Sequence, residues 1–243
     1  MTNKLDITAT YRQFVQQLSK KHSRDKAMEK APGGEFEAIG ILERELLIQC
    51  GLKPDDYLID VGCGSGRLAK PLAEYLRGSY LGIDVVPEML DYARTLAGRE
   101  DWRFEVASGF AIPERAGRAD MVCFFSVFTH LLHEQSFVYL RDAKRVLKPG
   151  GTVVFSFLEF AIPSHWTVFE GNVADIGGTE HLNMFMDRDG IHAWASHLDL
   201  EIVALHDGDK PHIPIPRPLT LENGTTIVDR GNLGQSVAVL RKR

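Results

Sequence analysis

Residues 58–67 read LIDVGCGSGR, and this stretch decides the fold of the chain. A short apolar run of strand length ends at three glycines, and a helical pattern follows over residues 67–76. Glycines at a strand-to-helix turn allow tight backbone geometry and let a ligand approach the main chain. The spacing is GxGxG, whereas the dinucleotide fingerprint GxGxxG would need glycine at Arg67, and the lack of GK[ST] excludes a P-loop. Asp60 would repel a pyrophosphate but suits a cationic ligand.

Downstream of this turn, strand and helix patterns alternate. Apolar runs predict strands at 80–85, 103–106, 120–125, 152–157, 201–206 and 235–240. Helical patterns lie at 133–147, at 187–198 with Asp187 as N-cap, and after Pro87, which suits the first helical position. Four prolines in 211–218 predict irregular structure, and Asn223-Gly224 predicts a hairpin turn. The alternation predicts an α/β fold with a doubly wound parallel sheet.

The two flanks of this core have patterns of their own. Residues 1–50 are helical in pattern, with Tyr11 on the apolar face of one helix and a second helix over 36–50 that ends at Gly51. Residues 159–186, which include His165, Trp166 and His181, are predicted to be an inserted lid that contacts substrate. We expect a single domain over 1–243, with a helical cover (1–50), a ligand-binding core (57–157), the lid, and a C-terminal helix and strands (187–243).

Composition narrows the class of protein. The chain has 243 residues and a formal net charge of −5, which disfavours a nucleic-acid partner. Its three cysteines lie far apart without CxxC, so a disulfide framework or a metal site is not expected and a reducing cytoplasm fits. No run approaches the roughly 18 apolar residues of a membrane span, so no membrane association is expected. The oligomeric state stays open.

Asp84 ends the second strand of the predicted sheet, 18 residues after Gly66. An acid at the carboxyl end of that strand can accept hydrogen bonds from both hydroxyls of a ribose. An aspartate at a strand end is also a common turn former. The distance from the glycines favours a ligand-binding role.

At this point the chain resembles the class I S-adenosylmethionine-dependent methyltransferases, in particular those that act on small molecules. LIDVGCGSGR resembles the first motif of the family, GIDVVPEML its second-strand segment, DMVCFFSVFTHL its fourth strand and LKPGGTVVFSF its fifth. The resemblance covers about residues 57–157. It implies a seven-stranded, mostly parallel, Rossmann-like sheet with N-terminal helices and an inserted lid, and S-adenosylmethionine as the cofactor.

The resemblance also implies residue roles. Glycines of the first motif would line the methionine moiety beside Asp60, Asp84 would bind the ribose, and the loop 107–110 would close one face of the adenine. Many relatives have aspartate where Ser108 stands, and a serine offers only a hydroxyl to the adenine amino group. The residues that the resemblance assigns to the cofactor are Asp60, Gly62, Cys63, Gly64, Gly66, Asp84, Val85, Met89, Ser108, Gly109, Phe110 and Ser126.

His130 is the candidate catalytic residue. It follows the fourth strand, and an imidazole with a pKa near 6.5 can act as a base at neutral pH. An oxygen acceptor that is not already ionised would need such a base. The alternative is that His130 caps the following helix or only binds substrate.

Several functions remain open at this stage. The leading one is methyl transfer to a small-molecule acceptor, with oxygen favoured over nitrogen. Residues 125–128, FSVF, lack the (Asp/Asn/Ser)-Pro-Pro-(Tyr/Phe) pattern of enzymes that methylate the exocyclic amines of bases. The alternatives are a protein or RNA methyltransferase, a nicotinamide-linked oxidoreductase, and a cofactor-binding interaction protein without catalysis.

Overall fold

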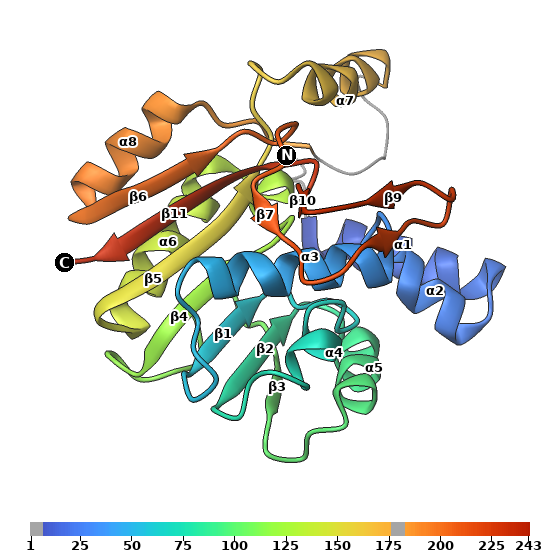
Figure 1. The fold of residues 1–243 in the computed structure, drawn as a ribbon, viewed down its shortest axis with the longest axis horizontal. Helices are drawn as coiled ribbons and strands as arrows, with labels where there is room; N and C mark the ends of the chain where they lie inside the picture. Colours follow the sequence, from blue (N-terminus) through green and yellow to red (C-terminus); the bar gives the residue numbers. More distant parts are fainter. Residues whose placement is uncertain (1–6, 176–182) are drawn as a thin grey trace, which may run out of the picture.

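A seven-stranded sheet organises the computed structural model, which describes residues 7–175 and 183–243 (Figure 1). Its strand order is β3-β2-β1-β4-β5-β11-β6, and β11 alone in this sheet runs antiparallel to its neighbours. The doubly wound, mostly parallel sheet predicted from the sequence is therefore confirmed. The strands are β1 (Leu58–Val61), β2 (Tyr80–Asp84), β3 (Arg103–Val106), β4 (Ala119–Phe124), β5 (Leu147–Phe157), β6 (Leu200–His206) and β11 (Ser236–Lys242).

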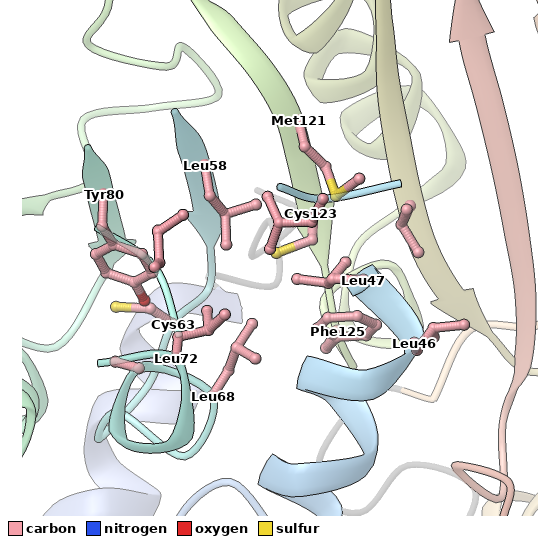
Figure 2. Packing of buried hydrophobic residues seen from close by; sticks show 14 of the residues in the cluster. Leu46, Leu47, Leu58, Cys63, Leu68, Leu72, Tyr80, Met121, Cys123 and Phe125 are labelled. Carbon is pink, nitrogen blue, oxygen red and sulfur yellow. The ribbon is translucent and has the colours of Figure 1, made fainter. Parts of the chain in front are cut away.

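Helices cover both faces of the sheet, because its strands alternate their apolar side chains between two cores. Leu58 of β1 packs in one cluster with α3, α4 and α5, whereas Ile59 packs in the other with α6 and α8. Figure 2 shows the first cluster, in which Leu46 and Leu47 of α3 lie near Phe125. The helices are α1 (Ile7–Lys21), α2 (Arg24–Lys30), α3 (Phe36–Gln49), α4 (Ala69–Leu72), α5 (Pro87–Ala97), α6 (His133–Val146), α7 (Pro163–Ala174) and α8 (Arg188–His197), with a 3₁₀ turn, η1, at Phe128–His130.

The helix expected over 67–76 is shortened to α4 (Ala69–Leu72). Pro71 has no N–H, so it cannot donate to the carbonyl of Arg67 four residues earlier. That carbonyl oxygen lies against α3, where an added Cβ on Gly40 would come within 2.3 Å of it. The glycine therefore permits a close approach of α3 to the turn that follows β1.

The C-terminal part contains more regular structure than its prolines predicted. The expectation of an irregular 211–218 is wrong, because β7 (Ile213–Pro214) pairs with β10 (Arg230–Gly231). Pro214 has no N–H to donate, but this pairing does not need one, because the N–H groups of the flanking residues His212 and Ile215 donate across it. The predicted turn at Asn223-Gly224 is confirmed, and it joins β8 (Leu219–Thr220) to β9 (Thr226–Ile227).

Other boundaries agree closely with expectation. Asp187 caps α8 as predicted, with its carboxylate accepting from Gly190 N at 2.8 Å. Within residues 159–186 the structure describes α7 (Pro163–Ala174), while His181 lies outside the described residues. No helix among the residues described is long and apolar enough to cross a membrane.

Candidate active site

The turn after β1 (Leu58–Val61) is built by glycines with two different jobs. Gly62 has φ +78°, and an added Cβ would lie 2.4 Å from Val127 Cγ2. Its backbone N–H donates to Ile83 O at 2.7 Å, which fixes the turn beside β2. Gly66 also has a positive φ, +90°, but its missing Cβ makes room for Ala93 Cα of α5 at 2.9 Å. Gly66 therefore allows α5 to pack closely against the turn.

Asp84, at the end of β2, is buried and held in one orientation. Its Oδ2 accepts from Gly64 N and its Oδ1 from Val86 N, both at 2.9 Å. Burial raises the pKa of this carboxyl to about 6, while the backbone hydrogen bonds and Arg12 act in the opposite direction. Each oxygen keeps a further lone pair, so the ionised group can accept two more hydrogen bonds from a ligand.

Asp60 lies inside β1 and is also buried. Tyr80 Oη donates to its Oδ2 at 2.8 Å, and Cys123 Sγ donates to its Oδ1 at 3.5 Å. Burial and, to a smaller extent, the neighbouring Glu43 carboxylate raise the pKa of Asp60 to about 7, against the lowering effect of the Tyr80 hydrogen bond. A cation bound here would favour the ionised form and recover part of the free-energy cost of burial.

A cavity of about 280 Å³ collects these groups at the carboxyl ends of β1, β2 and β4. This is the edge of a parallel sheet where ligands bind in doubly wound folds. It brings together ten of the residues predicted for the site. These are Asp60, Gly62, Cys63, Gly64, Asp84, Val85, Gly109, Phe110, Ser126 and His130.

Three predicted residues do not line this cavity. Gly66 faces α5, as described above. Met89 is fully buried in a cluster with Val15 and Met28, where it anchors the N-terminal helices. Ser108 is exposed, although its neighbours in the same loop reach the cavity. The roles of these three in cofactor binding stay predictions.

The N-terminal helices close one side of the cavity. Tyr11 of α1 lines it, together with Ala31 after α2. Two hydrogen bonds fasten these helices to the core: Arg12 Nε donates to Val85 O at 2.9 Å, and Ser65 Oγ donates to Met28 O at 2.7 Å. The segment predicted as a helical cover thus borders the site.

The cavity is also lined by a buried ion pair, which sequence analysis did not identify. Arg67 pairs through its guanidinium with the Glu43 carboxylate of α3, and its NH1 donates to Gly33 O at 2.9 Å. Burial raises the pKa of Glu43, and Arg67 lowers it. One signal was available: Glu43 lies between Leu42 and Leu46 on the apolar side of its helix. A charge in that position is buried and needs a partner.

Tyr139 of α6 is a second residue that the sequence did not single out. It lines the cavity, donates to Gly109 O at 3.1 Å and packs edge-on against Phe110 with ring centroids 5.4 Å apart. These contacts order the loop after β3. Its distance along the chain from every motif explains why no local pattern revealed it.

His130 and His165 differ in their surroundings. His130 ends η1 and lines the cavity. His165 is buried: Glu159 N donates to its Nδ1 at 3.0 Å, so the proton lies on Nε2, which donates to Gly234 O at 3.0 Å. His165 does not line the cavity, and neither does any other described residue of 159–186. The lid function therefore stays a prediction.

Known proteins similar to this chain agree on its family. The family model described as "Methyltransferase domain" matches residues 59–155. The ubiquinone biosynthesis O-methyltransferase of Roseobacter denitrificans is 29% identical over 58% of this chain and 53% of its own length. The malonyl-[acyl-carrier protein] O-methyltransferase of Serratia marcescens is 26% identical over 63% of this chain and 58% of its own. The chain spans little more than half the length of these curated relatives.

A solved structure agrees on the fold. Magnesium protoporphyrin IX methyltransferase from Synechocystis superimposes with a TM-score of 0.64 at 15% identity, covering 97% of this chain and 99% of that one. The alignment extends the similarity of fold beyond the matched family model to nearly the whole chain. Residues 59–155 of this chain therefore match the methyltransferase domain family, and nearly the whole chain shares the Rossmann-like methyltransferase fold.

Proposed function

We propose that the protein transfers a methyl group from S-adenosylmethionine to a hydroxyl oxygen of a small molecule. The observation that carries this proposal is the cavity itself, which has buried Asp84 and the glycine turn on its walls together with His130. Such a transfer requires a carboxylate that accepts hydrogen bonds from the cofactor ribose and a titratable base beside the same cavity. We propose further that residues 1–243 act as one domain.

The residues of the cavity fit the cofactor. Asp84 would accept from both ribose hydroxyls, Val85 and Phe110 would border the adenine, and Asp60 would stabilise the ammonium of the methionine end. Asp60 also opposes a pyrophosphate, which disfavours the nicotinamide-linked alternative. When bound, S-adenosylmethionine would supply a methyl group on a sulfonium that is reactive toward in-line attack.

His130 would take the proton from the acceptor hydroxyl. The acceptor oxygen would bond to the methyl carbon as that carbon separates from sulfur, and the hydroxyl proton would move to the imidazole. The products would be S-adenosylhomocysteine and a methyl ether or ester. The walls of the cavity hold the reacting groups together and exclude water, and this positioning contributes much of the acceleration.

A small-molecule acceptor is favoured over a macromolecular one. Both curated relatives described above are O-methyltransferases, one of ubiquinone biosynthesis and the other of malonyl-[acyl-carrier protein], so they support oxygen as the methylated atom. The N-terminal helices border the cavity, which narrows access for a protein or RNA substrate. The free thiols Cys50, Cys63 and Cys123 fit the reducing conditions of the cytoplasm, where we place the reaction.

The cofactor is tested by calorimetric titration with S-adenosylmethionine, S-adenosylhomocysteine and NAD. We expect the first two to bind, and Asp84→Asn to weaken them by roughly 10- to 100-fold, as loss of hydrogen bonds to a charged group predicts. Glu88→Gln is the matched control, because Glu88 is an exposed acid four residues away. Binding of NAD alone, or equal binding by both variants, would contradict the proposed cofactor.

The base is tested with His130→Ala. We expect kcat to fall by about 10²–10⁴-fold with little change in S-adenosylhomocysteine affinity, since the side chain acts on the acceptor. The lower limb of the pH–kcat profile should disappear as well. Full turnover with an unchanged pH profile would assign His130 to helix capping, and cofactor binding without turnover on any hydroxylated acceptor would favour the non-catalytic alternative.

A further inference from the structure

A second cavity of about 220 Å³ adjoins the cavity of about 280 Å³ described above, which we call the cofactor cavity. The two share their boundary, which is lined on both sides by Pro32, Glu43, Arg67, Phe125, Ser126 and His130. A group bound in the second cavity would therefore lie beside His130 and next to the cofactor cavity. The remaining lining comes from residues far apart in the chain, namely Gly33, Gly34, Ile39, Ser156, Leu233 and Gln235.

Three neutral residues of this cavity, Gln235, Ser126 and Ser156, are joined by hydrogen bonds. Gln235 Nε2 donates to Ser126 Oγ at 3.2 Å, while Ser126 N donates to Ser156 Oγ at 2.8 Å. Ser126 follows β4 with φ +57°, a conformation that non-glycine residues rarely adopt and that marks functional sites. The Gln235 amide offers further N–H and carbonyl capacity, so it can both donate to and accept from a hydroxyl.

Gln235 stands on a loop, yet both of its neighbours are fixed. The Gly234 carbonyl accepts from Nε2 of buried His165 at 3.0 Å. The Ser236 hydroxyl binds the buried Glu159 carboxylate, which in turn pairs with Arg188 at 2.7 Å. The buried polar groups at the start of 159–186 thus hold Gln235 in place, which lowers the entropy lost when it binds a ligand.

Charge and size define the ligand. Glu43 and Arg67 are the charged side chains in the lining, and they neutralise each other. A carboxylate would therefore enter beside Glu43 without a cation left to pair with it. At roughly 30 Å³ per water, the cavity has room for on the order of seven waters. A ligand of about that many heavy atoms is a single six-membered ring with one substituent, such as phenol. Ile39, Phe125 and Leu233 provide apolar walls for such a ring.

We propose that the second cavity binds the methyl acceptor as an uncharged ring bearing a hydroxyl, and that Gln235 is the residue that recognises this hydroxyl. The proposal rests on the proposed methyl transfer and names its substrate class. Gln235 would orient the hydroxyl toward His130, which takes its proton, and the oxygen would form its new bond to carbon at the boundary with the cofactor cavity.

The test uses the full chain saturated with S-adenosylhomocysteine and three probes: catechol, benzoate and 1,2-dimethoxybenzene. Catechol carries the neutral hydroxyl, benzoate carries a charge, and the third probe has no hydroxyl to donate. We expect catechol to bind with a Kd of roughly millimolar, about tenfold tighter than either of the other two. With S-adenosylmethionine in its place, catechol should be converted to its monomethyl ether.

Gln235→Met keeps the length of the side chain and removes its polarity, and it should weaken catechol about tenfold without changing S-adenosylhomocysteine affinity. Gln17→Met is the control, since Gln17 is exposed on α1 (Ile7–Lys21) and lines neither cavity. Normal S-adenosylhomocysteine binding with no preference for catechol, or with no effect of Gln235→Met, would overturn this inference alone. Failure to bind S-adenosylhomocysteine would overturn the proposed function and the inference with it.

Discussion

The two adjoining cavities are built in different ways. The cofactor cavity takes most of its walls from the ends of consecutive strands, so a glycine turn, Asp84 and the loop after β3 reach it in sequence order. The second cavity takes its walls from the loop before α3, the ends of β4 and β5, and the segment before β11. One cavity follows from local motifs, and the other exists only because distant segments meet.

This difference separates what the two cavities decide. Backbone groups and an acid at a strand end define the first, so its ligand can be inferred for any chain that has the motif. Side chains from segments far apart in the chain define the second cavity, so it can change while the sheet stays the same. The ion pair Glu43–Arg67 lies on the boundary, and it offers the strongest way to break the comparison.

The largest effect is expected for Arg67→Met. It leaves Glu43 buried without its partner, which costs about 3–5 kcal/mol of unfolding free energy for a buried pair. Because the pair lines both cavities, binding of both cofactor and acceptor should weaken together. Chemical denaturation and the two titrations described above measure these effects.

Two further variants check the cause of that loss. The double variant Glu43→Gln/Arg67→Met should recover much of the stability, because no buried charge remains unpaired. Arg77→Met, which breaks an ion pair with Asp55 in which both side chains are more than two-thirds exposed, should leave the unfolding midpoint nearly unchanged. Equal losses for Arg67→Met and Arg77→Met would show that burial of the pair is not the cause.

The same difference explains what could be predicted from the sequence. The strands that enter the cofactor site and the helix opened by Pro87 follow from periodicity, and most of the ten predicted residues that line the cavity follow from the family resemblance. Glu43 and Gln235 escaped because neither belongs to a motif; their position depends on how α3 and the segment before β11 pack on the sheet. Pro71 interrupts the helix expected over 67–76, but nothing in the local sequence points to Gly40, 31 residues away, whose missing Cβ permits the close approach of α3. The assignment of 159–186 as a lid followed sequence landmarks, whereas buried His165 bonds to the segment beside Gln235.

The next effect in size contrasts two helical glycines, one packed against the turn beside both cavities and one on a helix that lines neither. Gly40→Ala in α3 would place a Cβ 2.3 Å from Arg67 O, so it should destabilise the fold by about 1–3 kcal/mol and disturb both cavities. Gly171→Ala in α7 meets nothing within 4 Å and should stabilise by about 0.5–1 kcal/mol, because alanine is the better helix former. Denaturant unfolding of both variants checks the signs. If Gly40→Ala stabilises as well, α3 does not pack closely on the turn.

The smallest effect comes from pH, and it can distinguish the two acids of the cofactor cavity. In the proposed complex a ribose hydroxyl would donate to ionised Asp84, whose pKa is raised to about 6 by burial, so adenosine affinity should fall as pH falls through that value. The fraction ionised drops about fourfold between pH 7.5 and 5.5, and adenosine affinity should drop by about the same factor.

S-adenosylhomocysteine also carries an ammonium, which we place at Asp60, whose pKa of about 7 makes it lose charge over the same range. Its affinity should therefore fall more steeply than that of adenosine, whose base and sugar do not titrate there. In Asp84→Asn the adenosine dependence should vanish while a slope for S-adenosylhomocysteine persists. If the affinities of the two ligands fall equally with pH in the unmodified protein, Asp60 does not bind the ammonium, and Asp84 is the acid of this cavity that contacts the cofactor.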